Sequence, residues 1–210
     1  MTLSFPKDFI WGTATASYQI EGAYNKDGRG LSIWDTFSRT PGKVVNGDTG
    51  DVACDHYHRF HDDIKLMKDL GVTAYRFSIA WPRLFPNGDD VKETRGFDFY
   101  NKLIDSLIEN DIEPMVTLYH WDLPQSLEDQ GGWANRNTVN MFEIYAKACA
   151  EAFGDRINSW ITLNEPWCTS WLGYSNGVHA PGKKDFKLAI SASHHTALAH
   201  AAGLRAIKSV

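Results

Sequence analysis

The sequence lacks the cysteine pattern of a disulfide framework. It contains only Cys54, Cys149 and Cys168, and no two of them form a Cys-x-x-Cys pair. An odd number of thiols without paired spacing is typical of a reduced, cytosolic protein. We interpret Cys168 as a small packing residue rather than a nucleophile, because no base accompanies it in the sequence.

Long apolar runs and runs of basic residues are also absent. No window approaches the ~18 uninterrupted apolar residues that a membrane-spanning helix needs, and residues 1–8 do not resemble a signal peptide. The net charge is −5, without a basic cluster. We therefore expect a cytoplasmic protein that binds neither nucleic acid nor a membrane surface.

No residue pattern indicates a metal or a cofactor. His56, His58 and His61 are close in sequence, but their spacing does not place all three on one face of a helix. We interpret them as solvated histidines. Gly131-Gly132 lacks the pattern of a phosphate-binding loop. The sequence thus predicts a protein that uses neither a metal nor a cofactor.

Tryptophan is abundant instead. The chain has eight Trp among 210 residues, within an otherwise ordinary globular composition of 43% hydrophobic and 22% charged residues. A core of this size does not demand so many indoles. Indole rings are common walls for sugars, so the surplus favours a carbohydrate pocket.

Short apolar runs alternate with amphipathic stretches along the chain. This alternation predicts parallel strands joined by right-handed helical connections, with a first strand buried on both faces. The predicted strands are 9–16, 73–79, 113–119 and 160–163. The predicted helices begin at the caps Asp55, Asn137 and Asp185, with a fourth over 100–108. The stretches 22–54 and 81–96 are predicted to be loops.

Polar side chains occur where these strands end. The carboxyl ends of parallel strands meet at one edge, where the active sites of α/β proteins gather. Amides and an imidazole can donate and accept hydrogen bonds, and this suits a polyhydroxylated ligand beside stacked indoles. The residues in question, with the indoles among them, are Gln19, Arg76, Ser78, Trp81, His120, Trp121, Asn164, Glu165 and Trp167.

Glu165 and Arg76 carry the chemistry expected at this edge. Pro166 disfavours a helical conformation for Glu165, so we expect extended backbone up to the acid. Neighbouring indoles would exclude water from Glu165, which favours the protonated form that a general acid needs. Arg76 lies in the middle of a strand, where its charge requires an anion close by.

Four motifs resemble those of glycoside hydrolase family 1. Residues 162–166, Thr-Leu-Asn-Glu-Pro, resemble the acid/base motif of that family, and residues 9–22 resemble its N-terminal signature. Residues 75–81 and 118–124 match as well. The family consists mainly of retaining β-glucosidases on a (βα)₈ barrel. The resemblance therefore implies an α/β fold and β-glucosidase chemistry on a β-glucoside or oligosaccharide substrate.

The resemblance also implies a role for each motif residue. Glu165 would be the acid/base, and Arg76 would hold the nucleophilic carboxylate. The implied sugar contacts are Gln19, His120, Trp121 and Asn164 on the glycone side and Trp167 on the leaving-group side.

The nucleophile motif of the family, Ile/Val-Thr-Glu-Asn-Gly, does not occur in residues 1–210. Glu21 and Asp122 are nearby acids, but neither has a partner that would place it opposite Glu165. We therefore expect residues 1–210 to form a single domain of four βα units, the N-terminal (βα)₄ half of a TIM barrel.

Two functions remain open at this point. In the first, the chain is half of a retaining β-glycosidase, inactive or very weak until a complementary C-terminal half supplies the nucleophile. In the second, it is a non-catalytic half-barrel that assembles with itself and binds sugar weakly. Four parallel strands cannot close a barrel, so in both cases we expect oligomerisation, in the simplest case a homodimer of half-barrels.

Overall fold

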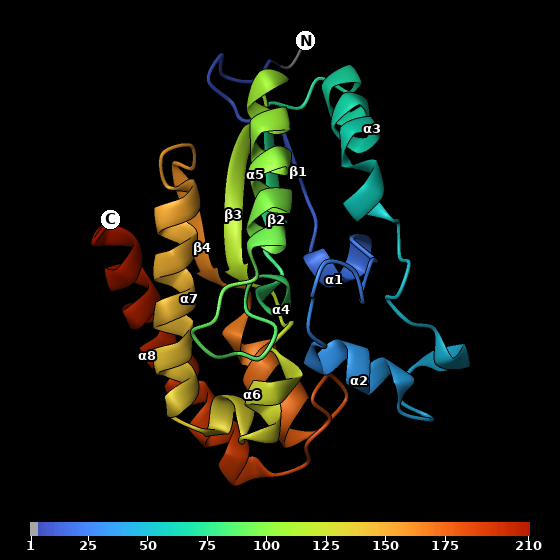
Figure 1. Cartoon of the computed structure of the whole chain (residues 1–210), viewed down its shortest axis with the longest axis vertical. Coiled ribbons are helices and arrows are strands. Elements are labelled where there is room, and N and C mark those ends of the chain that lie inside the picture. Colours follow the sequence, from blue (N-terminus) through green and yellow to red (C-terminus); the bar gives the residue numbers. More distant parts are fainter. Residues whose placement is uncertain (1–3) are drawn as a thin grey trace.

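A computed structural model describes residues 4–210 and contains one parallel sheet of four strands. The strands follow chain order across the sheet, as β1 (Gly12–Ala14), β2 (Ala74–Ser78), β3 (Glu113–Tyr119) and β4 (Ser159–Leu163). Each strand pairs in parallel with the next, for example Arg76 with Met115 and Tyr119 with Leu163. Sequential order with helical connections is the arrangement of a (βα) barrel wall (Figure 1).

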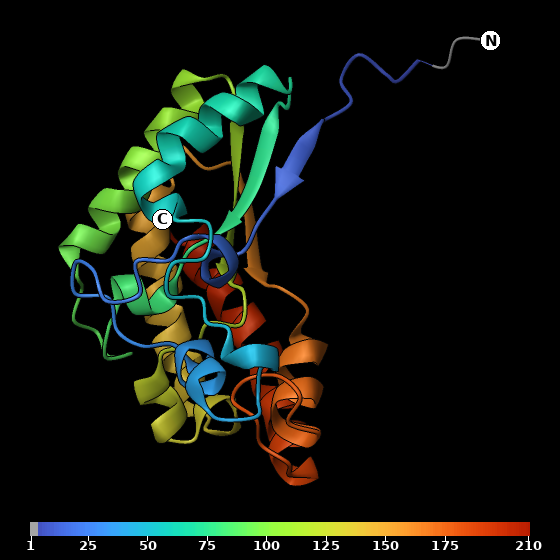
Figure 2. The ribbon, with the colours of Figure 1, turned by 90° about the vertical axis from the view of Figure 1, so that its right-hand side faces the viewer.

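Four long helices connect and flank the strands. They are α3 (His56–Asp69), α5 (Thr94–Glu109), α7 (Asn137–Phe153) and α8 (Phe186–Lys208). Figure 2 shows α3 and α5 side by side along one face of the sheet, with the amino-terminal segment extending away from it. The buried positions of α5 repeat at helical spacing, and they include Phe99, Tyr100, Leu103, Ile104 and Leu107.

Large aromatic side chains fill the core between helices and sheet. Trp81 is fully buried and stacks on Tyr145 at 4.8 Å between ring centroids. The Tyr145 hydroxyl donates to the backbone oxygens of Leu118 and Ile79, 2.7 and 3.2 Å away. Helix α7 is thereby fastened to the ends of β2 and β3. Trp81, which the sequence placed among the strand-end polar groups, belongs to this core and not to the pocket.

Short helical elements occupy the strand-to-helix connections. They are α1 (Ser17–Ile20), α2 (Ile33–Arg39), a 3₁₀ turn (Val45–Gly47), α4 (Trp81–Leu84), α6 (Gln125–Asp129), a second 3₁₀ turn (Gly132–Ala134) and a π-helix, η3 (Cys168–Ser175). Helix α2 and α4 lie in stretches predicted to be loops. A capping box explains α2, because Ser32 and Asp35 bond to each other's backbone amides.

The first strand differs from its prediction. We expected a strand over 9–16 buried on both faces, but β1 has only three residues, and Phe9, Ile10 and Trp11 are 43–57% exposed. The reason is its position at the edge of the sheet, where it pairs with β2 alone. Its apolar side chains have no neighbouring strand on the other side in the described part of the chain.

Two of the predicted helix caps were wrong, and one is confirmed. Asp55 adopts a left-handed conformation (φ 56°) without capping α3, and its carboxylate contacts His58 Nδ1 at 2.6 Å. Asn137 is the first helical residue of α7 rather than its cap. Asp185 accepts from the amides of residues 187 and 188 and caps α8 as predicted. His56 is also not solvated, because it is buried against Asp63.

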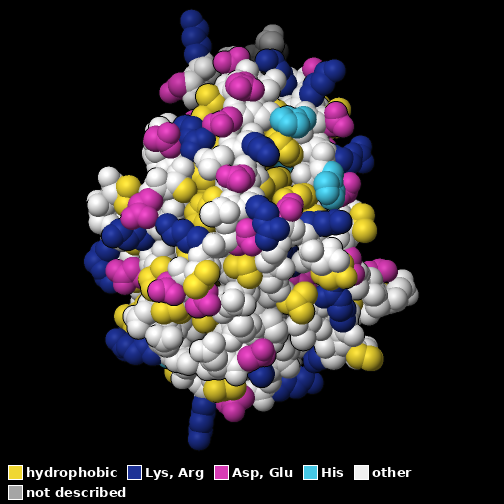
Figure 3. Space-filling view, viewed as in Figure 1, with side chains coloured by type: hydrophobic (Ala, Val, Ile, Leu, Met, Phe, Trp, Pro, Cys, Tyr) yellow, Lys and Arg dark blue, Asp and Glu magenta, His cyan; other side chains and the backbone are white. Residues whose placement is uncertain are grey.

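The outer face carries mixed charge. Acidic and basic side chains are interspersed over the face seen in Figure 3, and exposed pairs such as Lys92–Glu151 lie 3.7 Å apart. None of the helices formed by residues 4–210 has the length and apolarity needed to cross a membrane.

An ion pair between Arg83 and Glu21 lies in the interior. Arg83 on α4 is fully buried, and its Nε and Nη2 donate to Glu21 Oε2 at 3.1 and 3.0 Å. The Tyr100 hydroxyl donates to the other carboxylate oxygen at 2.5 Å. The pair joins the segment after α1 to α4 and α5. Glu21 therefore has a structural role and not a catalytic one.

We expect Glu21→Gln to lower the free energy of unfolding by about 3–5 kcal/mol, because it leaves the buried Arg83 guanidinium without a counter-charge. Urea denaturation measures the loss. Glu151→Gln, which removes one partner of an exposed pair, is the control and should cost less than about 1 kcal/mol. Equal losses in the two variants would contradict the structural role of the Glu21–Arg83 pair.

Candidate active site

The side-chain amide of Asn164 connects the polar groups at the carboxyl ends of the strands. Asn164 follows β4, and its backbone amide donates to Tyr119 O at 2.9 Å, which extends the β3–β4 ladder. Its Oδ1 accepts from Arg76 Nη2 at 2.7 Å, and its Nδ2 lies 3.1 Å from His120 Nε2. Its carbonyl accepts from the Trp121 indole at 3.0 Å. Asn164, which follows β4, thus contacts residues at two other strands, Arg76 of β2 and His120 after β3.

This network determines the state of His120. Arg76 can only donate, so Oδ1 of Asn164 faces Arg76 and the amide nitrogen faces the imidazole. The amide nitrogen donates to Nε2, which requires a neutral ring with its proton on Nδ1. Burial, reinforced by the Arg76 charge and opposed by Glu165, lowers the pKa of His120 to about 4. The imidazole is therefore neutral at physiological pH.

Arg76 bonds only to neutral acceptors. Besides Asn164, its Nε donates to Thr117 Oγ1 at 3.0 Å. No carboxylate of residues 4–210 lies within 4.0 Å of its guanidinium. The anion that the sequence argument required beside Arg76 is not supplied by the described residues.

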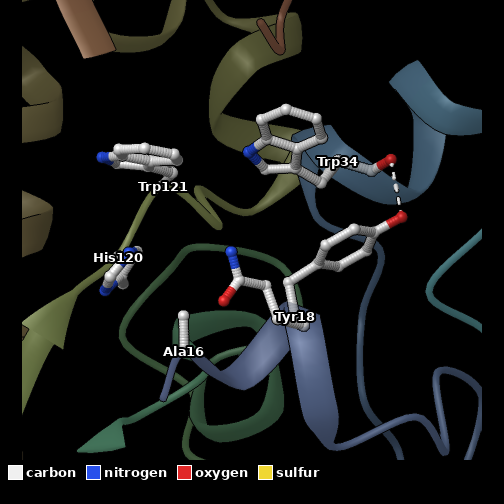
Figure 4. Close-up of a pocket in the computed structure, with 6 residues that line it drawn as sticks. Ala16, Tyr18, Trp34, His120 and Trp121 are labelled. Atoms are coloured by element: carbon white, nitrogen blue, oxygen red, sulfur yellow. Dashed lines mark hydrogen bonds between the residues drawn. The ribbon is translucent and has the colours of Figure 1, made fainter. Parts of the chain in front are cut away.

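A cavity of about 190 Å³ adjoins this network. In Figure 4 the rings of Tyr18, Trp34, His120 and Trp121 surround the space above Ala16. Gln19, on α1, lines the same cavity. The structure thus brings together Gln19, His120 and Trp121 as expected. The full lining is Ala16, Tyr18, Gln19, Trp34, His120 and Trp121.

A row of neighbouring aromatic rings, tilted against one another, forms one wall of the site. Trp121 has a left-handed backbone (φ 75°), and its ring lies 5.2 Å from that of His179. His179 in turn lies 5.5 Å from Trp34, which stands 5.9 Å from Tyr18. Burial lowers the pKa of His179, while the Glu165 charge opposes the shift. The wall is therefore aromatic and uncharged at neutral pH.

Glu165 has a different backbone and environment from those expected. Its φ is 42°, so the chain is not extended here. Its carbonyl accepts from the amides of Cys168 and Thr169, so the chain turns at Glu165 directly into the helical segment that follows. The carboxyl is exposed, as is 60% of Trp167. The indoles therefore do not exclude water from Glu165 in this structure.

Cys168 is the nearest partner of this acid. Its thiol donates to Glu165 Oε2 at 3.3 Å. Burial, followed by the hydrogen bond to the Glu165 carboxylate, raises the pKa of the thiol. Cys168 is thus a protonated hydrogen-bond donor, half-buried at the site, rather than a core residue.

Three lining residues were not singled out from the sequence. Tyr18 and Trp34 line the cavity, and the ring of His179 lies between two indoles. The Ser32-x-x-Asp35 capping box was an available signal for the helix that carries Trp34. Nothing local marks His179. Within residues 4–210, no group of three or more His, Cys, Asp or Glu side chains could hold a metal ion.

Comparison with known proteins identifies the family. A family model described as glycosyl hydrolase family 1 matches residues 1–210. The chain belongs to glycosyl hydrolase family 1. Its relatives include beta-glucosidase A of Acetivibrio thermocellus, 56% identical over 94% of this chain and 44% of the relative. Beta-glucosidase A of Thermotoga maritima is 56% identical over 97% of this chain and 45% of the relative.

Solved structures show the same fold. The family 1 chain superposes on the Thermotoga maritima beta-glucosidase in complex with glucoimidazole with a TM-score of 0.96 at 54% identity. The match covers 98% of this chain and 47% of that structure. The AHE enzyme from Alicyclobacillus herbarius also gives 0.96, at 58% identity. The chain spans about half the length of the relatives it matches, and its sheet is half of a (βα)₈ barrel.

We expect Asn164→Asp to raise the pKa of His120 well above about 4, because a carboxylate in place of the amide favours the imidazolium. Imidazole nitrogen shifts followed by NMR through the pH range 3–8 measure the change. Asn140→Asp, on the exposed side of α7, is the matched control and should leave His120 unchanged. An unaltered His120 titration in Asn164→Asp contradicts the network described above.

Proposed function

We propose that this chain supplies the acid/base half of a retaining β-glucosidase that hydrolyses terminal β-glucosides. The observation that carries the proposal is the Arg76–Asn164–His120 network, which adjoins a ring-lined cavity. Its central residue, Asn164, directly precedes Glu165 in the chain. The beta-glucosidases among the relatives support the substrate class. A neutral imidazole and two amides beside aromatic rings suit the hydroxyls and apolar face of a pyranose.

In this mechanism Glu165 first protonates the glycosidic oxygen and later takes a proton from the attacking water. Gln19, His120 and Asn164 bind the glycone hydroxyls, and Trp121 lines that pocket. On the leaving-group side, Trp167 contacts the departing group.

A retaining enzyme also needs a second carboxylate ~5–5.5 Å from the acid/base. Glu21 is bound to Arg83 and Tyr100, and Asp122 is fully buried against Ser17. Neither can attack a sugar in the cavity. We infer that the nucleophile comes from outside residues 1–210 and is held by Arg76, and that residues 1–210 alone turn over little or no substrate.

A second candidate function rests on the open edges of the sheet. Beside β1, the exposed rings of Phe5, Phe9 and Trp11 contact one another in tilted and edge-to-face pairs, with 4.6–4.7 Å between ring centroids. Beside β4, a groove of about 470 Å³ lies between η3 and α8. Unpaired strand edges with apolar side chains favour association, so the alternative is a self-assembling half-barrel, a homodimer in its simplest form, without turnover.

Hydrolysis of an aryl β-glucoside tests the first function. Residues 1–210 alone should give little or no turnover. Addition of the part of the Thermotoga maritima β-glucosidase that this chain does not cover should restore it. Glu165→Gln should lower the restored kcat by at least about 100-fold, because general acid catalysis contributes about that much.

The control is Glu151→Gln, an exposed carboxyl on α7 far from the strand ends. Restored turnover that survives Glu165→Gln contradicts the acid/base assignment. Sedimentation of the same samples decides the alternative, because a compact monomer that folds cooperatively without a partner rules out the self-assembling half-barrel.

A further inference from the structure

The proposed mechanism leaves the buried carboxyl of Asp122 unused. Asp122 follows His120-Trp121 and is fully buried. Its Oδ2 accepts from the Ser17 hydroxyl at 2.7 Å, whereas its Oδ1 has no hydrogen-bond partner among residues 4–210. A buried carboxyl with hydroxyl partners alone is costly to ionise, so its presence calls for a reason.

Asp122 belongs to a cluster that joins three elements. Ser17 is the first residue of α1, the four-residue helix that carries Gln19. Residue Ala16 provides no side-chain cap for α1. The amide of Ser17 instead donates to Ser78 Oγ at 2.8 Å, and the Ser78 hydroxyl lies 3.1 Å from Ser17 Oγ. Because Ser78 ends β2 and Asp122 follows β3, the cluster fixes α1 to two strand ends.

We propose that Asp122 acts through Ser17 and Ser78 as a positioning residue, which holds the Gln19 segment against His120 while its carboxyl is protonated and releases it on ionisation. The inference rests on the proposed function, in which Gln19 and His120, which line the same cavity, bind the glycone.

The electrostatics of the cluster support this coupling. Burial raises the pKa of Asp122 to about 7, opposed by the Ser17 hydrogen bond. Two charges face it from neighbouring segments, Arg29, which lowers the pKa, and Glu21, which raises it. Each is already paired, Arg29 with Asp35 at 2.9 Å and Glu21 with Arg83 at 3.0 Å. Burial therefore dominates, and the carboxyl titrates near neutral pH.

The direction of the effect follows from linkage. Opening of α1 hydrates Asp122 and returns its pKa toward the ordinary value of 3.8. Ionisation therefore favours the open form, and the opening constant rises by up to about tenfold per pH unit between that value and about 7, then levels off. The neutral acid keeps the cluster intact, because its proton can lie on Oδ1 while Oδ2 still accepts from the Ser17 hydroxyl.

Amide hydrogen exchange in the chain itself tests the hold on α1. Protection factors, which divide out the intrinsic pH dependence of exchange, are measured for the amides of residues 17–21. We expect them to fall roughly tenfold between pH 5.5 and 7. In Asp122→Asn they should stay constant, because the Asn side-chain oxygen can accept from Ser17 as the neutral acid does and the amide cannot ionise.

Ser17→Ala should lower protection at every pH. The matched controls are Ser106→Ala, a buried serine on α5, and Glu128→Gln, a buried carboxyl that accepts from Tyr174 outside the cluster. Both should retain the pH dependence of the unaltered chain. The proposal is overturned if Asp122→Asn keeps this pH dependence, or if Ser17→Ala exchanges no faster than Ser106→Ala.

The complemented enzyme provides the functional readout. Ser17→Ala should raise KM for the aryl β-glucoside several-fold while kcat changes less than about twofold, because the reacting carboxyls are untouched. An unchanged KM overturns the positioning role. If no variant or control shows turnover while the exchange results hold, the proposed function fails and the hold of Asp122 on α1 stands.

Discussion

The arrangement of the site depends on the side-chain amide of Asn164. An amide has one accepting and one donating end, and Arg76 can only donate. The side-chain amide of Asn164 therefore has only one possible orientation, with its oxygen toward Arg76. The donating end then meets His120, which must be neutral to accept. Parallel pairing makes the contact possible, because it brings the ends of β2, β3 and β4 to one edge. Strand register thereby selects the tautomer of the imidazole, while burial and the Arg76 charge keep the ring neutral.

Two buried carboxyls near the site illustrate how surroundings set a role. Glu21 receives two hydrogen bonds from the Arg83 guanidinium and one from Tyr100. It serves as a structural anion. Asp122 receives only the Ser17 hydroxyl, and burial raises its pKa to about 7. Asp122 combines a single hydroxyl partner with a pKa near neutrality, so it is suited to couple pH to the pocket.

The sequence predicted those features that depend on local pattern. The strand 113–119 has the predicted bounds. Arg76, His120 and Asn164 converge because the carboxyl ends of parallel strands lie at one edge of the sheet. Features that depend on distant contacts were not predictable. Trp34 and His179 reach the site from connecting segments, and only tertiary packing brings their rings together.

The left-handed backbone at Glu165 was missed for a related reason. The proline after it favours an extended conformation locally. The amides of the following helical segment need an acceptor, however, and the Glu165 carbonyl provides it. Satisfying those backbone groups outweighed the local preference. Likewise, the exposure of β1 reflects its place at the sheet edge, which its apolar composition does not reveal.

The open edges of the sheet and the exposure of Glu165 have a common cause. Among residues 4–210 no further strand pairs with β4, and Glu165 and Trp167 lie exposed beside the groove between η3 and α8. A general acid gains from the removal of water, and a retaining mechanism needs a second carboxylate close by. An element that paired with the sheet edge would exclude water from Glu165 and could bring an anion to Arg76 in the same step. In the proposed function, completing the barrel and activating the acid are therefore one event.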